Sequence, residues 1–546
     1  MKKMNKLLAL VLAMVMVLGL ATVASAATVS VSGELIDGHT FKAYQIFAGT
    51  ETQTDNQLVD ITWGSGINAN AFLAALKDEN SSAFMTTVTN EETGEETTVN
   101  IFAGCAEAKD VAEVLGKNNT NNALANAVAK LALANKKGEG TLLSTETTDL
   151  PSGYYLIVDE TQFGADDKNT VYNAALLQVT GTVTIAQKTD RPSVEKKVLE
   201  NNQYTLDEGF GAGYNDVADY NMGDAVPFHL IGTVPDMSRY ETYKYIFHDT
   251  MSAGLTLNES SIKVYVAGNK AGTDKTEISG WTKAVNGQSF TVSFTDLKTV
   301  PGVSQGKYII VEYTATLNQN AVVGLPGNPN VVYLEYSNKP DQSGSGNEHP
   351  TGNTPEDKVI VFTYELDTTK VDGADSTELK DAEFVLSRGT GENKEYAKLD
   401  NASKVTGWTK TQSEATVLKS GEDGLFKVIG LDDGTYYLKE TKAPEGYNLL
   451  KEEITVVINA TTTNGQNWTD GDASKALTAL AVTADGKAGT GNPSTGIAGI
   501  TVANNKGSTL PETGGIGTTI FYVLGGMLVV CAVVLMVSKK RMSAEG

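Results

Sequence analysis

The stretch GTYYLKETKAPEGY, residues 434–447, decides the fold of the last third of the chain. Its aromatic and β-prone residues favour a strand, and the Ala-Pro-Glu-Gly sequence after them favours a turn. Alternate residues of a strand lie on one face, so Tyr436, Leu438 and Glu440 point the same way. A carboxylate is therefore predicted among apolar side chains, where an isolated charge is costly.

The same alternation places two more polar side chains on buried faces. In residues 365–372, Leu366 and Thr368 share a face with Lys370. In residues 500–507, the last predicted strand, Ile500 and Val502 share a face with Asn504, so Asn505 points outward. A buried lysine, a buried carboxylate and a buried amide in one small domain indicate a shared chemical purpose.

The motif Tyr-x-Leu-x-Glu-Thr-x-Ala-Pro-x-Gly-Tyr, with an early Lys and a late Asn, resembles the collagen-adhesin B-type domain. The resemblance implies an isopeptide bond from Lys370 to Asn504, with Glu440 as the catalyst. Desolvation favours the neutral amine, which is the nucleophile, and a protonated carboxyl, which shuttles protons. Two alternatives stay open: Asn505 as the acceptor, or a buried Lys370–Glu440 salt bridge without a bond.

A parallel set of residues lies in the preceding segment, which is rich in short strands and turn signals typical of a β-sandwich. Alternation buries Lys196, Asp249 and Asn338 beside apolar neighbours. The stretches DTMSAGLT and YSNKP resemble the A-type domain of Gram-positive pilins, which implies a Lys196–Asn338 bond catalysed by Asp249. Lys197 is the rival nucleophile if the strand carries a bulge, and Asp249 otherwise only caps a turn.

The first segment, residues 27–188, is predicted to be β-rich with a helical insertion over residues 68–80, 110–116 and 121–135. FKAYQIF resembles the opening strand of the N-terminal domain of major pilins. Gln45 stands where some relatives have the bond-forming lysine, and an amide is not an amine nucleophile. We therefore expect no isopeptide bond here and a structural role for Glu160, with Lys42 as the residue that would overturn this expectation.

Lys188 ends the last strand of that segment. In sortase-built pilus shafts, a lysine at this position accepts the next subunit, within a Val-Tyr-Pro-Lys motif. This chain has Ile-Ala-Gln before Lys188, without the Tyr and Pro. By position, Lys188 is the expected acceptor, and Lys196 and Lys197 are nearby alternatives. The remaining alternative is that Lys188 is an ordinary surface lysine without a role in linkage.

Both ends of the chain look like targeting signals. Residues 1–26 have a basic start, an apolar core and an Ala-Ser-Ala cleavage site, which is typical of a secretory signal peptide. Residues 516–537 lack charge and are long enough to span a bilayer as a helix. The basic residues 538–541 follow and favour a cytoplasmic tail, so the body of the protein is expected outside the cell.

The order of Leu510, Pro511, Thr513 and Gly514, then an apolar span and a basic tail, resembles the wall-sorting signal of Gram-positive surface proteins. The resemblance implies that a sortase cleaves after Thr513 and transfers its carbonyl, which removes the transmembrane helix. Proline fixes a kinked, extended peptide, and glycine leaves room for the nucleophile of the enzyme.

Composition argues against several classes of partner, cofactor and activity. A formal net charge of -23 argues against nucleic acid as a partner. Cys105 and Cys531 lie in different contexts, which excludes a disulfide framework. The four histidines are scattered, so no metal or other cofactor is expected. No α/β pocket pattern or catalytic cluster indicates an enzyme beyond autocatalytic isopeptide formation.

The sequence therefore predicts a mainly β protein of tandem Ig-like β-sandwich domains. The expected boundaries are a signal peptide at 1–26, domains at 27–188, 189–358 and 359–505, and a sorting signal at 506–546. The resemblance to major pilins implies a secreted, wall-linked Gram-positive pilus subunit. Its implied partners are pilin-specific and housekeeping sortases, further copies of itself head to tail, minor pilins and peptidoglycan. The alternative is a monomeric adhesin, linked to peptidoglycan through Thr513, with a host or environmental surface ligand.

Overall fold

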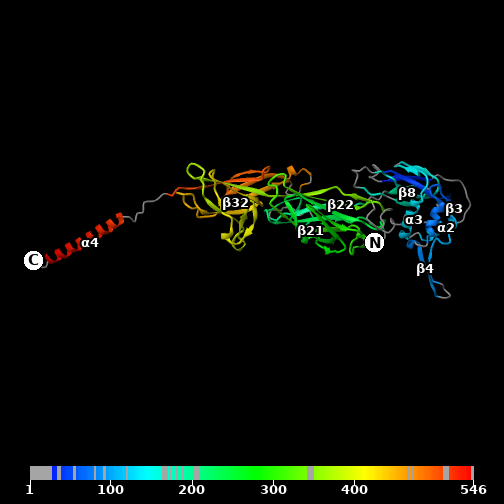
Figure 1. Cartoon of the computed structure of the whole chain (residues 1–546), viewed down its shortest axis with the longest axis horizontal. Helices are drawn as coiled ribbons and strands as arrows, with labels where there is room; N and C mark the ends of the chain where they lie inside the picture. The colour runs from blue at the N-terminus through cyan, green and yellow to red at the C-terminus, as the bar shows by residue number, and fades with distance from the viewer. Residues whose placement is uncertain are drawn as a thin grey trace.

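Three β-rich domains follow one another along an elongated chain, and a separate helix lies at the C-terminal end (Figure 1). The computed structural model describes residues 27–32, 39–52, 57–78, 81–89, 94–118, 121–144, 146–162, 170–172, 174–179, 182–186, 190–201, 209–340, 350–463, 468, 471–507 and 516–542. The mainly β architecture, with a few helices and an apolar C-terminal helix, confirms the predicted fold class.

The first domain contains two sheets and a helical insertion. Its strands and helices are β1 Ala27–Ser32, β2 Phe41–Glu51, β3 Leu58–Trp63, α1 Ala69–Leu76, η1 Ser82–Phe84, β4 Met85–Thr89, β5 Glu96–Asn100, α2 Ala108–Lys117, α3 Asn122–Ala134, β6 Thr141–Leu143, β7 Thr148–Leu150, β8 Gly153–Asp159, β9 Ala174–Val179 and β10 Thr182–Ala186. One sheet has the order β3-β2-β8-β9, with β6 beside β2, and the other is β10-β1-β7. Every residue of β8 is buried because apolar clusters cover both of its faces. The insertion lies between β3 and β6, as the helical periodicity predicted.

The second domain is a sandwich of two sheets. Its elements are β11 Val194–Leu199, β12 Tyr214–Asn215, β13 Val217–Asp219, β14 Ala225–Thr233, β15 Tyr245–Met251, β16 Leu255–Leu257, η2 Glu259–Ser261, β17 Lys263–Ala267, β18 Thr276–Glu277, β19 Thr282–Asn286, β20 Ser289–Phe294, η3 Leu297–Thr299, β21 Tyr308–Leu317, β22 Asn328–Ser337, β23 Thr351–Asn353 and β24 Asp357–Phe362. One sheet has the order β12-β11-β14-β21-β17-β18 and the other β13-β24-β22-β15-β20-β19. Alternating apolar residues of both sheets fill the space between them.

The third domain is a second sandwich. Its elements are β25 Tyr364–Asp372, β26 Glu383–Arg388, η5 Gly391–Asn393, β27 Glu395–Leu399, β28 Val405–Thr409, η6 Gln412–Glu414, β29 Leu418–Lys419, β30 Leu425–Leu431, β31 Gly434–Lys442, β32 Ile454–Thr462, η8 Ala473–Lys475, β33 Leu477–Ala484, β34 Lys487–Ala488, β35 Thr490–Asn492 and β36 Ile497–Asn504. The smaller sheet is β30-β25-β36-β35, and the larger is β28-β27-β26-β31-β32-β33-β34. The first and last strands, β25 and β36, lie side by side and parallel.

The second and third domains share one apolar core. β24 pairs with β13 and β22 of the second domain, and only the fully buried Thr363 separates it from β25. The boundary expected after residue 358 therefore falls inside β24, a strand that belongs to a sheet of the second domain. The backbones also touch at two glycines with positive φ: a Cβ at Gly324 would lie 2.2 Å from the backbone nitrogen of Gly496.

The C-terminal helix α4 covers Ile516–Met542 and stands apart from the sandwiches (Figure 1). Residues Ile520–Lys540 are long and apolar enough to cross a membrane, and none of their apolar window is buried in the protein. An exposed apolar helix of this length has the properties expected of the span at 516–537.

Candidate functional site

Three polar side chains meet in the core of the third domain, each from a different strand. Lys370 lies on β25, Glu440 on β31 and Asn504 on β36. All three are buried: Lys370 and Asn504 expose 0% of their surface and Glu440 exposes 3%. The alternation along each strand, read from the sequence, correctly turned these side chains inward. Asn505 is exposed, as the same alternation predicted.

The contacts among these residues form a chain from amine to amide to carboxylate. Lys370 Nζ donates to Asn504 Oδ1 at 2.7 Å and to the backbone oxygen of Val502 at 3.1 Å. Asn504 Nδ2 donates to Glu440 Oε1 at 2.9 Å and to Oε2 at 3.1 Å. The carboxylate is fixed in turn by the backbone N–H of Leu450, at 2.8 Å. The amine and the carboxyl thus both contact the amide that the isopeptide chemistry requires.

The electrostatic surroundings favour a nucleophilic amine. Burial lowers the pKa of Lys370 to about 8, and the negative charge of Glu440 only partly opposes this effect. A lysine with this pKa has a substantial neutral fraction near neutral pH, and the neutral amine is the form that attacks a carbonyl carbon.

In the second domain, Lys196 on β11 and Asp249 on β15 form an ion pair with no exposed side-chain surface. Tyr313 on β21 completes the group, because its hydroxyl accepts from Lys196 Nζ at 3.0 Å and donates to Asp249 Oδ2 at 2.9 Å. Burial lowers the pKa of Lys196 to about 8 and raises the pKa of Asp249. Both directions favour the uncharged forms of the pair.

The structure does not bring Asn338 to this pair. Asp249 lies opposite Val332 on β22, and Asn338 is six residues further along the chain, about 20 Å away at the rise of a strand. The amide of Asn338 instead contacts Thr170 Oγ1 at 3.4 Å. The amide next to Lys196 and Asp249 is Asn330, which is fully buried and opposite Met251.

Asn330 Nδ2 donates to the hydroxyl of Tyr313 at 2.7 Å, so the amide and Lys196 share one hydrogen-bond partner. Among the described residues, Asn330 Oδ1 and Asp249 Oδ1 have no hydrogen-bond partner. The sequence contained the signal: Asn330 continues the buried alternation of Val332, Leu334 and Tyr336 by one step toward the start of β22.

Lys197 faces away from this group. It pairs with Asp216 and lies over the ring of Phe210, with its Nζ 4.5 Å from the ring centroid. β11 pairs with β14 in an uninterrupted register through Lys196 and Lys197, so no bulge exchanges their faces.

In the first domain, Glu160 lies at the centre of a polar cluster. Lys42 Nζ lies 3.0 Å from its Oε2, Tyr44 donates to its Oε1 at 2.7 Å, and Lys136 also contacts Oε1. These contacts lower the pKa of Glu160 to about 2, against the opposing effect of burial. A carboxylate held ionised by two lysines fits the expected structural role, and the absence of an isopeptide bond in this domain stays a prediction.

The residues of intersubunit chemistry fall outside the described residues. These are the predicted acceptor Lys188 and the sorting-motif residues Leu510, Pro511, Thr513 and Gly514. The described chain reaches Ala186 at the end of β10, and resumes at Asp190.

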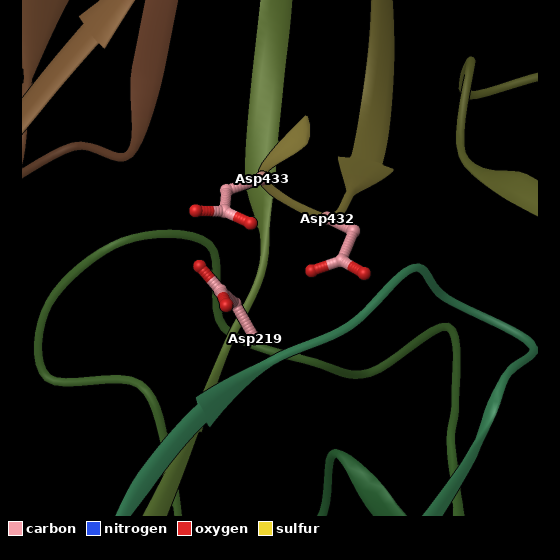
Figure 2. A group of neighbouring side chains, drawn as sticks. All are labelled: Asp219, Asp432 and Asp433. Carbon is pink, nitrogen blue, oxygen red and sulfur yellow. The ribbon is translucent and has the colours of Figure 1, made fainter. Parts of the chain in front are cut away.

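The contact between the second and third domains encloses three carboxylates that sequence reasoning missed. Asp219 ends β13, whereas Asp432 and Asp433 form the turn between β30 and β31. One oxygen from each lies within 4.8 Å of the others, and Figure 2 shows the side chains of Asp219 and Asp433 directed toward each other. Oxygen atoms of this kind are ligands that Ca²⁺ prefers. No spacing in the sequence could reveal a group assembled from segments so far apart.

Burial, followed by the nearby charges of Glu200 and Asp433, raises the pKa of Asp219 and of Asp432 well above the ordinary range. Tyr364 donates to Asp219 Oδ2 at 2.9 Å, and Asn201 donates to Asp432 at 3.0 Å. Carboxyl groups in such surroundings favour their protonated forms.

Three family models match separate parts of this chain. Residues 222–340 match the Gram-positive pilin backbone subunit 2, Cna-B-like domain. Residues 364–472 match the SpaA prealbumin-like fold domain, and residues 503–543 match the LPXTG cell wall anchor motif. The Cna-B-like model over residues 222–340 differs from the A-type domain that the sequence of the second domain resembles.

Among curated proteins, the chain is 24% identical over 419 residues to the trypsin-resistant surface T6 protein of Streptococcus pyogenes serotype M6. The match covers 66% of this chain and 70% of that protein. Among solved structures, the T6 backbone pilin of serotype M6 Streptococcus pyogenes has a TM-score of 0.48 at 17% identity, covering 89% of this chain and 100% of that one.

A second solved structure, the group B streptococcus pilus 2b backbone protein, has a TM-score of 0.36 at 25% identity, covering 57% of this chain and 100% of that one. The family models include a pilin backbone domain and a cell wall anchor motif, and the curated relative is a surface protein. The chain is therefore a homologue of the T6 protein, with matches to two pilin-type domain models and to the LPXTG cell wall anchor motif.

Proposed function

We propose that this protein is the shaft subunit of a covalently polymerised pilus, in which a sortase joins Thr513 of one subunit to Lys188 of the next. The anchor motif at residues 503–543 supports the sortase step, because it contains the expected cleavage site before an apolar helix. The homology to backbone pilins supports the shaft. Repeated head-to-tail linkage gives an open fibre, as heterologous contacts do.

The observation that carries the proposal for the internal chemistry is the buried contact of Lys370, Asn504 and Glu440. In the proposed reaction, the neutral amine of Lys370 attacks Cγ of Asn504, and the C–N bond to Nδ2 breaks. Glu440 takes a proton from the attacking amine and returns one to the leaving nitrogen, which departs as ammonia. The products are one secondary amide and one ammonia, with no net change of protons on Glu440.

For the second domain, we propose the corresponding bond from Lys196 to Asn330, with Asp249 as the proton carrier, in place of the bond to Asn338. The shared contact of Lys196 and Asn330 with Tyr313 supports this assignment. The complete burial of all three reacting side chains also supports it, because water and competing nucleophiles are excluded.

In this function the partners are pilin-specific and housekeeping sortases, other copies of the chain, minor pilins and peptidoglycan. The second candidate function is a monomeric adhesin linked to peptidoglycan through Thr513. It is favoured by one observation, the missing Tyr and Pro before Lys188, and it differs only in whether Lys188 reacts.

Boiled, detergent-treated wall extracts of the producing cells separate the two functions. A shaft subunit gives a ladder of covalent multimers on a denaturing gel, and Lys188→Ala reduces the ladder to a monomer band. Lys137→Ala, which removes an exposed lysine of the same domain, is the matched control and keeps the ladder. A single wall-linked band from the unmodified protein supports the adhesin instead.

A further inference from the structure

The hydroxyl of Tyr313 lies at the centre of the reacting group in the second domain. It accepts from Lys196 Nζ at 3.0 Å and from Asn330 Nδ2 at 2.7 Å, and it donates to Asp249 Oδ2 at 2.9 Å. One oxygen therefore contacts the nucleophile, the leaving nitrogen and the proton carrier. The phenol is buried, with 2% of its surface exposed.

The two sandwiches differ in how their carboxyl group reaches the amide. In the third domain, Glu440 accepts directly from Asn504 Nδ2 through both of its oxygens. In the second domain, the carboxyl group belongs to an aspartate, whose side chain is one methylene shorter. Asn330 Nδ2 donates to the hydroxyl of Tyr313 instead of to this carboxyl group. Among the described residues, Tyr313 thus provides the connection between Asp249 and the leaving nitrogen.

We propose that Tyr313 is a catalytic proton relay in the condensation of Lys196 with Asn330. This inference rests on the proposed bond in the second domain. As the amine attacks Cγ of Asn330, Asp249 takes a proton from Nζ. Tyr313 then gives its hydroxyl proton to Nδ2 and receives the proton held by Asp249, so the C–N bond breaks and ammonia leaves. The phenol ends the reaction in the state in which it began.

The surroundings of the ring suit this role. Phe228 stacks on Tyr313 with centroids 5.2 Å apart, and Phe290 meets it edge-on at 4.9 Å, so the hydroxyl is held in one place. Burial and the negative charge of Asp249 raise the pKa of Tyr313 well above its ordinary value. The phenol therefore stays protonated and has a proton to donate.

The experiment follows bond formation after a short pulse of synthesis in a cell-free system with the full mature chain. At each time point, proteolytic peptides and their masses give the bonded fraction of Lys196–Asn330 and, in the same molecules, of Lys370–Asn504. We expect Tyr313→Phe to slow the first bond by on the order of a hundredfold or more, the contribution typical of a positioned proton-transfer group, and to leave the second bond unchanged. Tyr245→Phe, which removes another buried hydroxyl from the same sandwich, keeps the ordinary rate.

A rescue variant distinguishes relay from packing. In Asp249→Glu combined with Tyr313→Phe, the longer carboxylate reaches the amide directly, as Glu440 does in the third domain, and the rate recovers. If Tyr313→Phe forms the Lys196–Asn330 bond at the rate of the unmodified chain, the relay is overturned while the bond itself stands. The relay is also overturned if Tyr313→Phe is slow and the double variant is equally slow. If the unmodified chain forms no Lys196–Asn330 peptide at all, the proposed bond fails, and the relay fails with it.

Discussion

Lys370 Nζ lies 2.7 Å from Asn504 Oδ1, although the two residues are 134 positions apart in the chain. They come from the first and last strands of the third domain, which run parallel as neighbours. An amide bond at this point would connect the two ends of the sandwich through its core. Most of the domain would then lie inside one closed covalent loop.

Replacement of Asn504 by Ala is expected to abolish the bond of the third domain. The intact mass should then lack the loss of one ammonia, and the domain should lose about 4 kcal/mol or more of stability, by analogy with a disulfide that closes a loop of this length. Mass spectrometry and thermal unfolding measure both effects. Asn505→Ala is the matched control, since Asn505 is exposed, and it should keep both the mass and the unfolding midpoint. If Asn505→Ala prevents the loss of ammonia and Asn504→Ala does not, Asn505 is the acceptor.

Asn330→Ala and Asn338→Ala form a second matched pair. Because Asn330 shares the Tyr313 hydroxyl with Lys196, only Asn330→Ala should prevent the second loss of ammonia. The test is the crosslinked peptide after digestion, with Lys196→Ala as the reference for a chain that lacks this bond. Loss of the peptide in Asn338→Ala alone would restore the acceptor that the sequence first indicated.

The rate of bond formation in the third domain should depend on pH. The pKa of Lys370 is lowered to about 8, so the fraction of neutral amine rises as the pH approaches 8 and then levels off. We expect the rate to rise about tenfold per pH unit below 8 and to flatten above it. Pulse synthesis at several pH values measures this dependence. A rate that is constant from pH 6 to 8 would show that deprotonation of Lys370 does not limit the reaction.

The carboxylate cluster between the second and third domains should make their stability fall with rising pH. An unfolded aspartate has a pKa of about 3.9, whereas burial and neighbouring carboxylates raise the pKa of Asp219 in the folded protein. Above about pH 4 the folded state therefore binds more protons than the unfolded state, and the free energy of unfolding decreases until the pH passes the folded pKa.

Asp219→Asn removes this titration and keeps an oxygen that can accept from Tyr364. We expect it to raise the free energy of unfolding at pH 7 by on the order of 1 kcal/mol, and to change it little at pH 4. Thermal unfolding at the two pH values is the measurement. Asp381→Asn, in an exposed ion pair, is the control and should have little effect at either pH. Equal effects of Asp219→Asn at both pH values would contradict the titration argument.

The burial of the three polar side chains in the third domain could be predicted from the sequence. Lys370, Glu440 and Asn504 each sit in a strand with strict alternation, and the period of two places them inward without further information. In the second domain, the same rule predicted that Lys196 and Asp249 are buried, as the structure shows. The structure does not place Asn338 beside them, because alternation gives the face of a residue but not its position along the strand, which only the pairing with β15 determines.

Other features needed the three-dimensional arrangement. Tyr313 alternates inward with Val311 and Ala315, so it resembles any core aromatic residue until its hydroxyl is seen between Lys196 and Asn330. The cluster at Asp219 joins two domains. The boundary expected after residue 358 lies within β24, because this strand, buried on both faces, follows a segment with the composition of a linker.

The parallel pairing of β25 and β36 has a consequence for a fibre under tension. A pull that enters at the start of β25 and leaves at the end of β36 would pass across the proposed bond from Lys370 to Asn504. Residues 371–503 would then lie off the line of force, although they make up most of the domain. A protease that nicked one of the exposed turns in this stretch would leave the covalent fibre unbroken. The shaft could therefore suffer surface damage outside the cell and still hold the bacterium in place.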